Sequence, residues 1–253
     1  FAEQDDVLDF VDSGITGTAP LDYLSIEYFD DRSLDFMRPA YPDVPEEAAG
    51  AVLFEVPYRP TEPHNPYPEN ALLSKLRGEL ERHGATLDWA LPISRREDAR
   101  GFRHSLPEAV NDFVRRRLGK IGTDMAVPHG RFREMMDAYE RESAACGVPF
   151  LMFGHIGDDH LHLNYLPEDE DAAARARGAY SRLARVAVEL GGTISAEHGV
   201  GKKTIINEAG EWVPYLDVQY GVRGMRTIAR AKKALDPNCI LNIGNMVPAE
   251  MLV

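Results

Sequence analysis

Apolar positions along the chain follow two spacings, one typical of helices and one typical of strands. Leu72, Leu76 and Leu80 recur every four residues, which predicts a helix over residues 70–83. By the same criterion, helices are expected at residues 96–118 (interrupted at Pro107), 131–146, 169–190 and 222–234. Short β-rich runs predict strands at residues 50–56, 86–91, 123–127, 150–156 and 160–166. Residues 2–45 are acidic and irregular, apart from an amphipathic stretch at residues 21–37.

Strands separated by helices, with one tight hairpin among them, favour an α+β arrangement over a doubly wound parallel sheet. This pattern predicts an antiparallel or mixed sheet with helices packed on one face, and of these we expect a ferredoxin-like antiparallel sheet. No repeat or low-complexity segment divides the chain, and its length fits one large domain or two small ones. Of these, we expect one domain over residues 1–253.

The composition excludes several classes of protein. Of the 253 residues, 44% are hydrophobic and 27% charged, as in ordinary globular proteins. A net charge of −13 argues against nucleic acid or an anionic membrane surface as the main partner. Cys146 and Cys239 cannot form a disulfide framework or a zinc ribbon, which fits a reducing compartment. Because no apolar run reaches the ~18 residues of a membrane span, we expect a cytoplasmic location, at the inner face of the membrane only through partners.

The segment from Phe150 to Pro167 is rich in histidine. Two β-rich runs flank Asp158 and Asp159, which predicts a hairpin with a two-residue turn at these aspartates. In that register His155 lies opposite His162, with Cβ atoms about 4.5–5.5 Å apart. Two imidazoles at this separation can share a metal ion.

Strand alternation places His160 and Asn164 on the same face as His162, while Leu161 and Leu163 lie on the other face. The polar face then holds the three histidines and Asn164. The alternative interpretation is an ordinary solvated face of a half-exposed sheet.

A second polar segment follows the helix expected at residues 169–190. Glu197 and His198 stand before Gly199, whose conformational freedom lets the chain turn so that both side chains serve one site. A carboxylate and imidazoles suit Zn²⁺ and its first-row neighbours, and three protein ligands leave a position open for substrate. A further histidine could act as a general base near neutral pH. A polar loop that solvates a helix end is the alternative.

Four motifs in these regions together resemble the C-terminal domain of FAD-linked oxidases of the vanillyl-alcohol oxidase class. They are Gly154-His-Ile-Gly-Asp-Asp-His-Leu-His162, Gly192-Thr-Ile-Ser-Ala-Glu-His-Gly-Val-Gly-Lys202, Thr123-Asp-Met-Ala-Val-Pro128 and Leu235-Asp-Pro-Asn-Cys-Ile-Leu-Asn-Ile-Gly-Asn-Met246. Within the class, the chain is similar to the branch that contains glycolate oxidase, D-lactate dehydrogenase and D-2-hydroxyglutarate dehydrogenase. Residues 1–119 match only in outline.

The resemblance implies a substrate-binding and catalytic cap domain of an FAD-dependent enzyme that oxidises a D-2-hydroxy acid to the 2-keto acid. In metal-bearing members, the positions matching His155, His162 and Glu197 bind a divalent metal, here Zn, Mn or Fe. The position matching His198 takes the hydroxyl proton.

Substrate and flavin contacts are also implied by the resemblance. Arg103 is the best match to an arginine that binds the substrate carboxylate, with Arg95, Arg96 and Arg100 as rivals. Further expected contacts are Lys120 and Asn164 to the substrate and Asn242 to the flavin.

The chain departs from the family pattern at three places. Asp159-His160 stands where the family often has Gly-Asn, and Gly122 stands where some members have a lysine, with Lys120 nearby. Ile243-Gly244-Asn245 replaces Pro-Gly-Lys, which removes a cation expected near the flavin.

The resemblance also implies partners. The family's FAD-binding domain, which has a different fold, would precede this chain and supply most flavin contacts. Because the chain starts with Phe1 instead of Met, we interpret it as a piece of a longer protein that cannot turn over alone. The other expected partners are a small anionic 2-hydroxy acid, an iron–sulfur electron-transfer subunit and a second copy in a homodimer.

Two other functions stay open at this point. One is a stand-alone metal-dependent hydrolase that uses the same His/His/Glu set to activate water. The other is a non-catalytic docking domain whose acidic face binds a separately encoded flavin or iron–sulfur protein.

Overall fold

The computed structural model describes residues 1–57, 69–85, 96–115, 117–207 and 209–252. The chain divides into two compact units, unit 1 with residues 1–120 and 149–166 and unit 2 with residues 121–148 and 167–253. Among the described residues, no helix combines the length and the apolar character that crossing a membrane requires.

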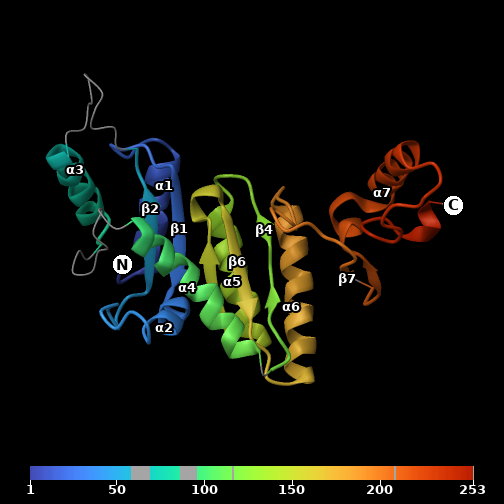
Figure 1. The fold of residues 1–253 in the computed structure, drawn as a ribbon, viewed down its shortest axis with the longest axis horizontal. Coiled ribbons are helices and arrows are strands. Elements are labelled where there is room, and N and C mark those ends of the chain that lie inside the picture. The colour runs from blue at the N-terminus through green and yellow to red at the C-terminus, as the bar shows by residue number, and fades with distance from the viewer. Residues whose placement is uncertain (58–68, 86–95, 116, 208, 253) are drawn as a thin grey trace. The chain divides into compact units, whose positions relative to one another are not determined.

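The described residues of unit 1 form four helices, a 3-10 turn and four strands (Figure 1). In chain order they are α1 (Gln4–Ile15), β1 (Ser25–Asp30), α2 (Asp31–Met37), β2 (Gly50–Glu55), α3 (Glu69–Arg82), α4 (Arg96–Val114), β5 (Phe150–Gly154), η1 (Ile156–Asp158) and β6 (His160–Tyr165). The strands pair antiparallel in the order β2-β1-β5-β6. This confirms the α+β class with an antiparallel sheet. The ferredoxin-like topology is not confirmed, because β1 and β2 are direct neighbours, with Phe29 opposite Ala51.

Helices cover both faces of the unit 1 sheet, which corrects the prediction of one covered face. Phe29 on β1 packs in one cluster with residues of α2 and α4, such as Leu34 and Phe102. On the opposite face, the ring of Phe10 on α1 lies 5.7 Å from the ring of Phe54 on β2. The sheet therefore has apolar side chains on both faces, and each face needs a covering layer.

The N-terminal region is more regular than its composition indicated. Val7, Leu8, Phe10 and Val11 form the buried side of α1, although acidic residues alternate with them. The amphipathic stretch at residues 21–37 is in fact β1 followed by α2. The prediction of an irregular segment was wrong because the charges lie on the exposed side of a helix whose apolar side has normal spacing.

Helix α4 runs without interruption through Pro107, where a break was expected. The missing N–H of Pro107 leaves the carbonyl of Arg103 without its helical donor. Phe102, Leu106 and Val110 are buried against the sheet on both sides of the proline. This packing stabilises α4 across Pro107, a residue that would end a helix with fewer tertiary contacts.

Unit 2 contains β3 (Ile121–Gly122), β4 (Met125–Ala126), α5 (Phe132–Cys146), α6 (Glu170–Glu189), β7 (Thr204–Ile206), β8 (Trp212–Pro214), α7 (Tyr215–Leu235) and the 3-10 turn η2 (Ala249–Met251). Helix α5 ends at Gly147 in the left-handed conformation, as the sequence predicted. Helix α7 begins earlier than predicted and has a break at Gly221. The β7–β8 hairpin was not predicted.

The predicted strand at residues 123–127 is reduced to the short strand β4, whose Ala126 exchanges two hydrogen bonds with Thr193. The strand predicted at residues 86–91 lies outside the described residues.

Asp30 gives the fold of unit 1 a testable pH dependence. Its buried carboxylate caps α2 by accepting a hydrogen bond from Ser33 N at 2.7 Å, and burial raises its pKa to about 6 despite hydrogen bonds from Ser33 and the charge of Arg32. Because the folded protein holds this proton more tightly than the unfolded chain, the stabilising contribution is complete below pH 4 and is lost as the pH rises through 6.

We expect Asp30→Asn, which keeps a capping oxygen, to remove this dependence. Between pH 4.5 and 7.5, the free energy of unfolding of the wild type should fall relative to that of the variant by roughly 2 kcal/mol. Urea denaturation at both pH values measures this difference. An unchanged difference between the two proteins would contradict the assignment.

Candidate functional site

The histidine hairpin differs from its predicted register. Phe153, instead of His155, lies opposite His162, and the strands are joined by the turn η1. The N–H of Asp158 donates to the carbonyl of His155 at 2.9 Å, and Asp159 adopts a left-handed φ of 52°. This 3-10 turn needs more residues than the expected two-residue turn. The pairing shifts by two residues, so His162 stays on its predicted face.

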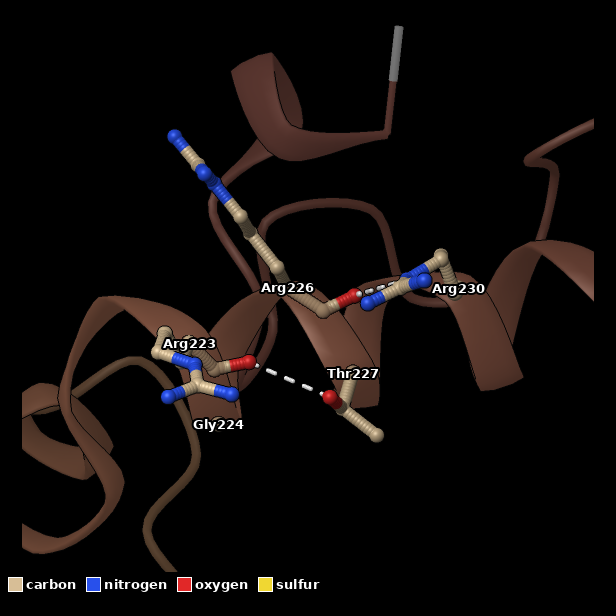
Figure 2. A pocket seen from close by; sticks show the side chains of 5 residues that line it. All are labelled: Arg223, Gly224, Arg226, Thr227 and Arg230. Carbon is tan, nitrogen blue, oxygen red and sulfur yellow. Dashed lines mark hydrogen bonds between the residues drawn. The ribbon is translucent and has the colours of Figure 1, made fainter.

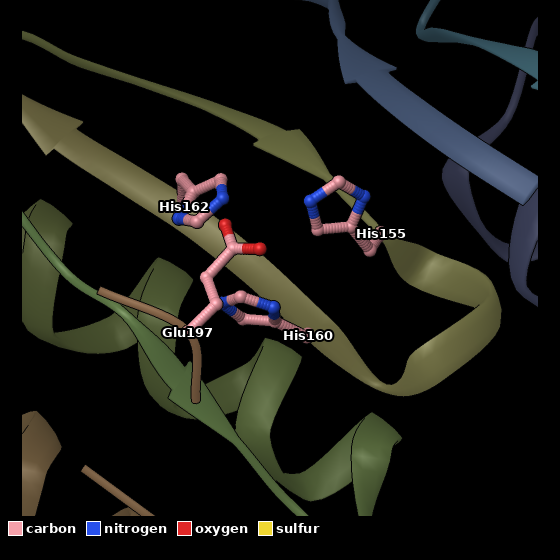
Figure 3. A group of neighbouring side chains, drawn as sticks. All are labelled: His155, His160, His162 and Glu197. Carbon is pink, nitrogen blue, oxygen red and sulfur yellow. The ribbon is translucent and has the colours of Figure 1, made fainter. Parts of the chain in front are cut away.

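The three histidines of the hairpin form one cluster, which Figure 3 shows. Ring centroids lie 5.7 Å apart for His155 and His162, 5.5 Å for His155 and His160, and 4.6 Å for His160 and His162. Each of the three histidines has one ring nitrogen that lies within 4.8 Å of a ring nitrogen of the other two. His160 and His162 are 4% and 9% exposed, so they are not part of a solvated polar face.

Glu27 joins this cluster, although the sequence analysis did not identify it. It lies on β1, is 7% exposed, and its Oε1 is 3.0 Å from Nδ1 of His155 and 3.0 Å from Nη2 of Arg103. A signal was available, because Glu27 is a charged residue between the apolar Ile26 and Tyr28. It was missed because β1 was not identified as a strand.

Three residues predicted to bind substrate lie in unit 1. Arg103 lies on α4 and forms an ion pair with Glu27. Its side chain is 43% exposed. Asn164 is 3% exposed and its Nδ2 donates to the carbonyl of His162 at 3.4 Å. Lys120 follows α4, and desolvation lowers its pKa. Of the rivals of Arg103, Arg95 lies outside the described residues.

In unit 2, the Glu197–His198 segment is held by the buried side chain of Asp124. Ser195 Oγ donates to Asp124 Oδ2 at 2.7 Å, and the backbone N–H of His198 donates to the same oxygen at 2.9 Å. The N–H of Glu197 lies 3.4 Å from both carboxylate oxygens. Asp124 lies in the motif Thr123–Pro128, but only the fold shows that it binds Ser195 and His198.

The two functional side chains of this segment lie close together. His198 Nδ1 is 3.4 Å from Asp124 Oδ1, and His198 Nε2 is 3.3 Å from Glu197 Oε1. The side chains of His198 and Glu197 are 59% and 42% exposed. Burial alone would raise the pKa of Asp124, but hydrogen bonds from Ser195 and His198, with the charge of His198, lower it. Asp124 is therefore an anion that can orient the imidazole of His198.

The start of the same segment is fixed by α7. Gln219 accepts a hydrogen bond from Ile194 N at 2.9 Å and donates to the carbonyl of Gly192 at 3.0 Å. The hydroxyl of Tyr215 donates to the carbonyl of Ile194 at 2.8 Å. Side chains from α7 thus hold residues 192–194, and Asp124 holds residues 195–198.

Asn242, the predicted flavin contact, is in a turn after α7. It has a left-handed φ of 47°, and its carbonyl accepts from the N–H of Asn245 at 3.1 Å. The next residue, Met246, donates to the carbonyl of Gly201 at 2.8 Å. The closing motif and the Gly199–Gly201 loop are therefore neighbours within unit 2.

Comparison with known proteins identifies the family. A model of the family "FAD linked oxidases, C-terminal domain" matches residues 2–246. The chain belongs to this family. It is 30% identical to glycolate oxidase subunit GlcD of Bacillus subtilis over 59% of this chain and 31% of that protein. It is 29% identical to the mitochondrial D-lactate dehydrogenase [cytochrome] of Arabidopsis thaliana over 50% of this chain and 21% of that protein.

Solved structures agree on the fold of this FAD-linked oxidase domain. The 4-ethylphenol oxidase of Gulosibacter chungangensis covers 97% of the chain at a TM-score of 0.57 and 17% identity, and the chain covers 52% of that protein. p-Cresol methylhydroxylase gives a TM-score of 0.55 at 12% identity, with 96% of this chain and 50% of that protein covered. The chain spans less than a third of the curated relatives that it matches and about half of the solved chains.

A separate hollow of about 520 Å³ lies on α7 of the FAD-linked oxidase domain (Figure 2). It is lined by Arg223, Gly224, Arg226, Thr227 and Arg230. Thr227 Oγ1 donates to the carbonyl of Arg223 at 3.1 Å, and Arg230 Nε donates to the carbonyl of Arg226 at 3.4 Å. The lining offers neither a metal ligand nor a base for neutral pH, so the redox site is not expected there.

Gly192 permits a close backbone contact that positions the Glu197–His198 segment. A Cβ at Gly192 would lie 2.2 Å from the carbonyl oxygen of Ala126 and 2.9 Å from that of Ala187. Because both atoms belong to the backbone, Gly192→Ala should force β4 and residue 193 apart.

We expect Gly192→Ala to lower the free energy of unfolding by about 1–3 kcal/mol or more, as measured by urea denaturation. The matched control is Gly178→Ala within α6, where the nearest atom is Nη1 of the flexible Arg182 at 3.4 Å. That change should stabilise the protein by about 0.5–1 kcal/mol because alanine favours a helix. Equal effects of the two substitutions would contradict the close contact.

Proposed function

We propose that this chain is the substrate-binding and catalytic cap domain of an FAD-dependent D-2-hydroxy-acid dehydrogenase of the glycolate, D-lactate or D-2-hydroxyglutarate type. The observation that carries the proposal is membership of the FAD-linked oxidase family together with the histidine cluster and the Asp124-held Glu197–His198 segment. Family membership favours this function over a stand-alone hydrolase or a docking domain.

His155, His162 and Glu197 would hold a divalent metal in this proposal. Their donors, two imidazoles and a carboxylate, fit Zn²⁺, Mn²⁺ or Fe²⁺, and the clustering of the histidine nitrogens supports the set. When bound, the metal supplies positive charge that polarises the hydroxyl and carboxylate of the substrate. His160, 4.6 Å from His162 between ring centroids, is a neighbour that can hydrogen-bond a ligand or the substrate.

A preceding domain would hold most of the FAD, which when bound would supply the acceptor for the hydride of the substrate. Within this chain, the turn that contains Asn242 is the proposed flavin contact. Asn245 Oδ1, three residues further on, is a buried acceptor without a partner among the described residues. A donor on a bound group would satisfy it.

His198 would take the proton of the substrate hydroxyl as the hydride leaves the α-carbon. With Nδ1 toward Asp124, and with the nearby Glu197 carboxylate bound to the metal in this proposal, the imidazole can keep its hydrogen on Nδ1 and use Nε2 as the base. The negative charge of Asp124 then stabilises the imidazolium that forms. Arg103, Lys120 and Asn164 would orient the anionic substrate, whose approach the net charge of −13 opposes.

Proton transfer by His198 is tested by stopped-flow flavin reduction in the protein joined to its FAD-binding domain. We expect His198→Gln to slow reduction by about 10²–10⁴-fold, while substrate affinity changes only a few-fold. The control is His129→Gln, which alters an exposed histidine after β4 and should leave reduction unchanged. A normal reduction rate in His198→Gln would remove the proposed role.

Metal analysis tests the ligand set. The purified chain should contain Zn, Mn or Fe or take up one of them on reconstitution, and His162→Ala and Glu197→Ala should each abolish uptake because three ligands become two. Elemental analysis after dialysis measures the content, with His129→Gln again as control. No metal in the wild type, before or after reconstitution, would refute the set.

A further inference from the structure

We propose that Glu27 is a positioning residue that keeps the hydrogen of His155 on Nδ1 and turns its Nε2 toward the histidine cluster. This goes beyond the ligand set, because it says which nitrogen of His155 binds and what selects it. It rests on the proposed function only for the identity of the bound group. The geometry itself lies within unit 1.

The contacts of His155 Nδ1 indicate whether this nitrogen donates or accepts a hydrogen bond. Glu27 Oε1 lies 3.0 Å from Nδ1, whereas Arg103 Nη2 lies 3.5 Å from it, at the outer limit of a hydrogen bond. Arginine can only donate, so Nδ1 would need a lone pair to accept from Arg103. That lone pair would face a carboxylate oxygen at 3.0 Å, which is repulsive. The shorter contact therefore favours Nδ1–H donating to Glu27.

With the hydrogen on Nδ1, the lone pair of neutral His155 is on Nε2. Figure 3 shows one ring nitrogen of His155 on the side of His162 and the other turned away from it. The nitrogen that binds Glu27 cannot also bind a metal. A carboxylate that fixes the tautomer of a metal-ligating histidine also raises the basicity of the ligand nitrogen.

The sheet and α4 hold Glu27 in this position. Tyr28 is opposite Gly154 across β1 and β5, so the residues next to this pair, Glu27 and His155, meet. Arg103 Nη2 contacts the same Oε1 at 3.0 Å and balances its charge. Burying a carboxylate is unfavourable even when it is paired, and well-packed apolar residues in place of a buried ion pair are often at least as stabilising. An orienting function explains why a carboxylate stands there.

The ring ¹⁵N chemical shifts of His155 in the metal-free full chain test this inference directly. The wild type should give the Nδ1–H tautomer. Glu27→Met, which keeps the size but has no comparable acceptor, should shift His155 toward the Nε2–H tautomer that free imidazole prefers. Glu27→Gln keeps an acceptor oxygen and should retain the wild-type tautomer. An Nε2–H tautomer in the wild type would overturn the proposal without any variant.

Zinc affinity, measured by competition with a chromophoric chelator, is the second readout. Glu27→Met should bind zinc about 10–100-fold more weakly than the wild type, and Glu27→Gln should lie between them. Thermal melts establish that both variants fold. A folded Glu27→Met with an unchanged His155 tautomer would refute the role of Glu27. If the tautomer shifts as expected but the wild type binds no metal, the role of Glu27 stands and the metal assignment fails.

Discussion

The buried carboxylate of Asp124 makes the interactions on which the arrangement of the Glu197–His198 segment depends. It accepts hydrogen bonds from Ser195 Oγ and the backbone N–H of His198, and it lies beside the imidazole of His198. A buried anion costs several kcal/mol unless donors surround it, and here the donors come from one loop. Hydrogen bonds to a charged acceptor stabilise by about 1.5–3 kcal/mol each. The loop therefore has one favourable conformation, and in it both Glu197 and His198 are presented to solvent.

Glu27 has the same physical role in unit 1. Its carboxylate is buried, and its donors come from α4 and from the loop after β5. In each unit, a buried acid of the scaffold holds a histidine, His155 in one and His198 in the other. The two scaffold acids contact imidazoles, and the exposed or clustered groups are the ones proposed to bind substrate and metal. In the proposed function, local cations such as Arg103 would offset the negative field that the acidic protein presents to an anionic substrate.

The hairpin shows which parts of a site can be predicted from local sequence. Alternation correctly placed His160, His162 and Asn164 on one face, because side-chain direction depends only on the two-residue period of a strand. The prediction of a two-residue turn was wrong, because Asp158-Asp159 is compatible with both a two-residue turn and a 3-10 turn. Since the error in register was an even number of residues, the cluster survived it. Glu27 was not predicted at all, because it reaches His155 from 128 positions away in the chain.

The sequence alone determined the family, through four motifs in order, and the family resemblance indicated which residues are the candidate ligands and the candidate base. Periodicity also determined most helices, because helical hydrogen bonds and packing faces are local properties. Only the tertiary structure decided that Pro107 lies inside a continuous helix, that both faces of the unit 1 sheet are covered, and that Glu27 and Asp124 hold the histidines. These features depend on burial and on contacts between distant segments. Both are set by how the elements pack, and no local pattern of residues encodes them.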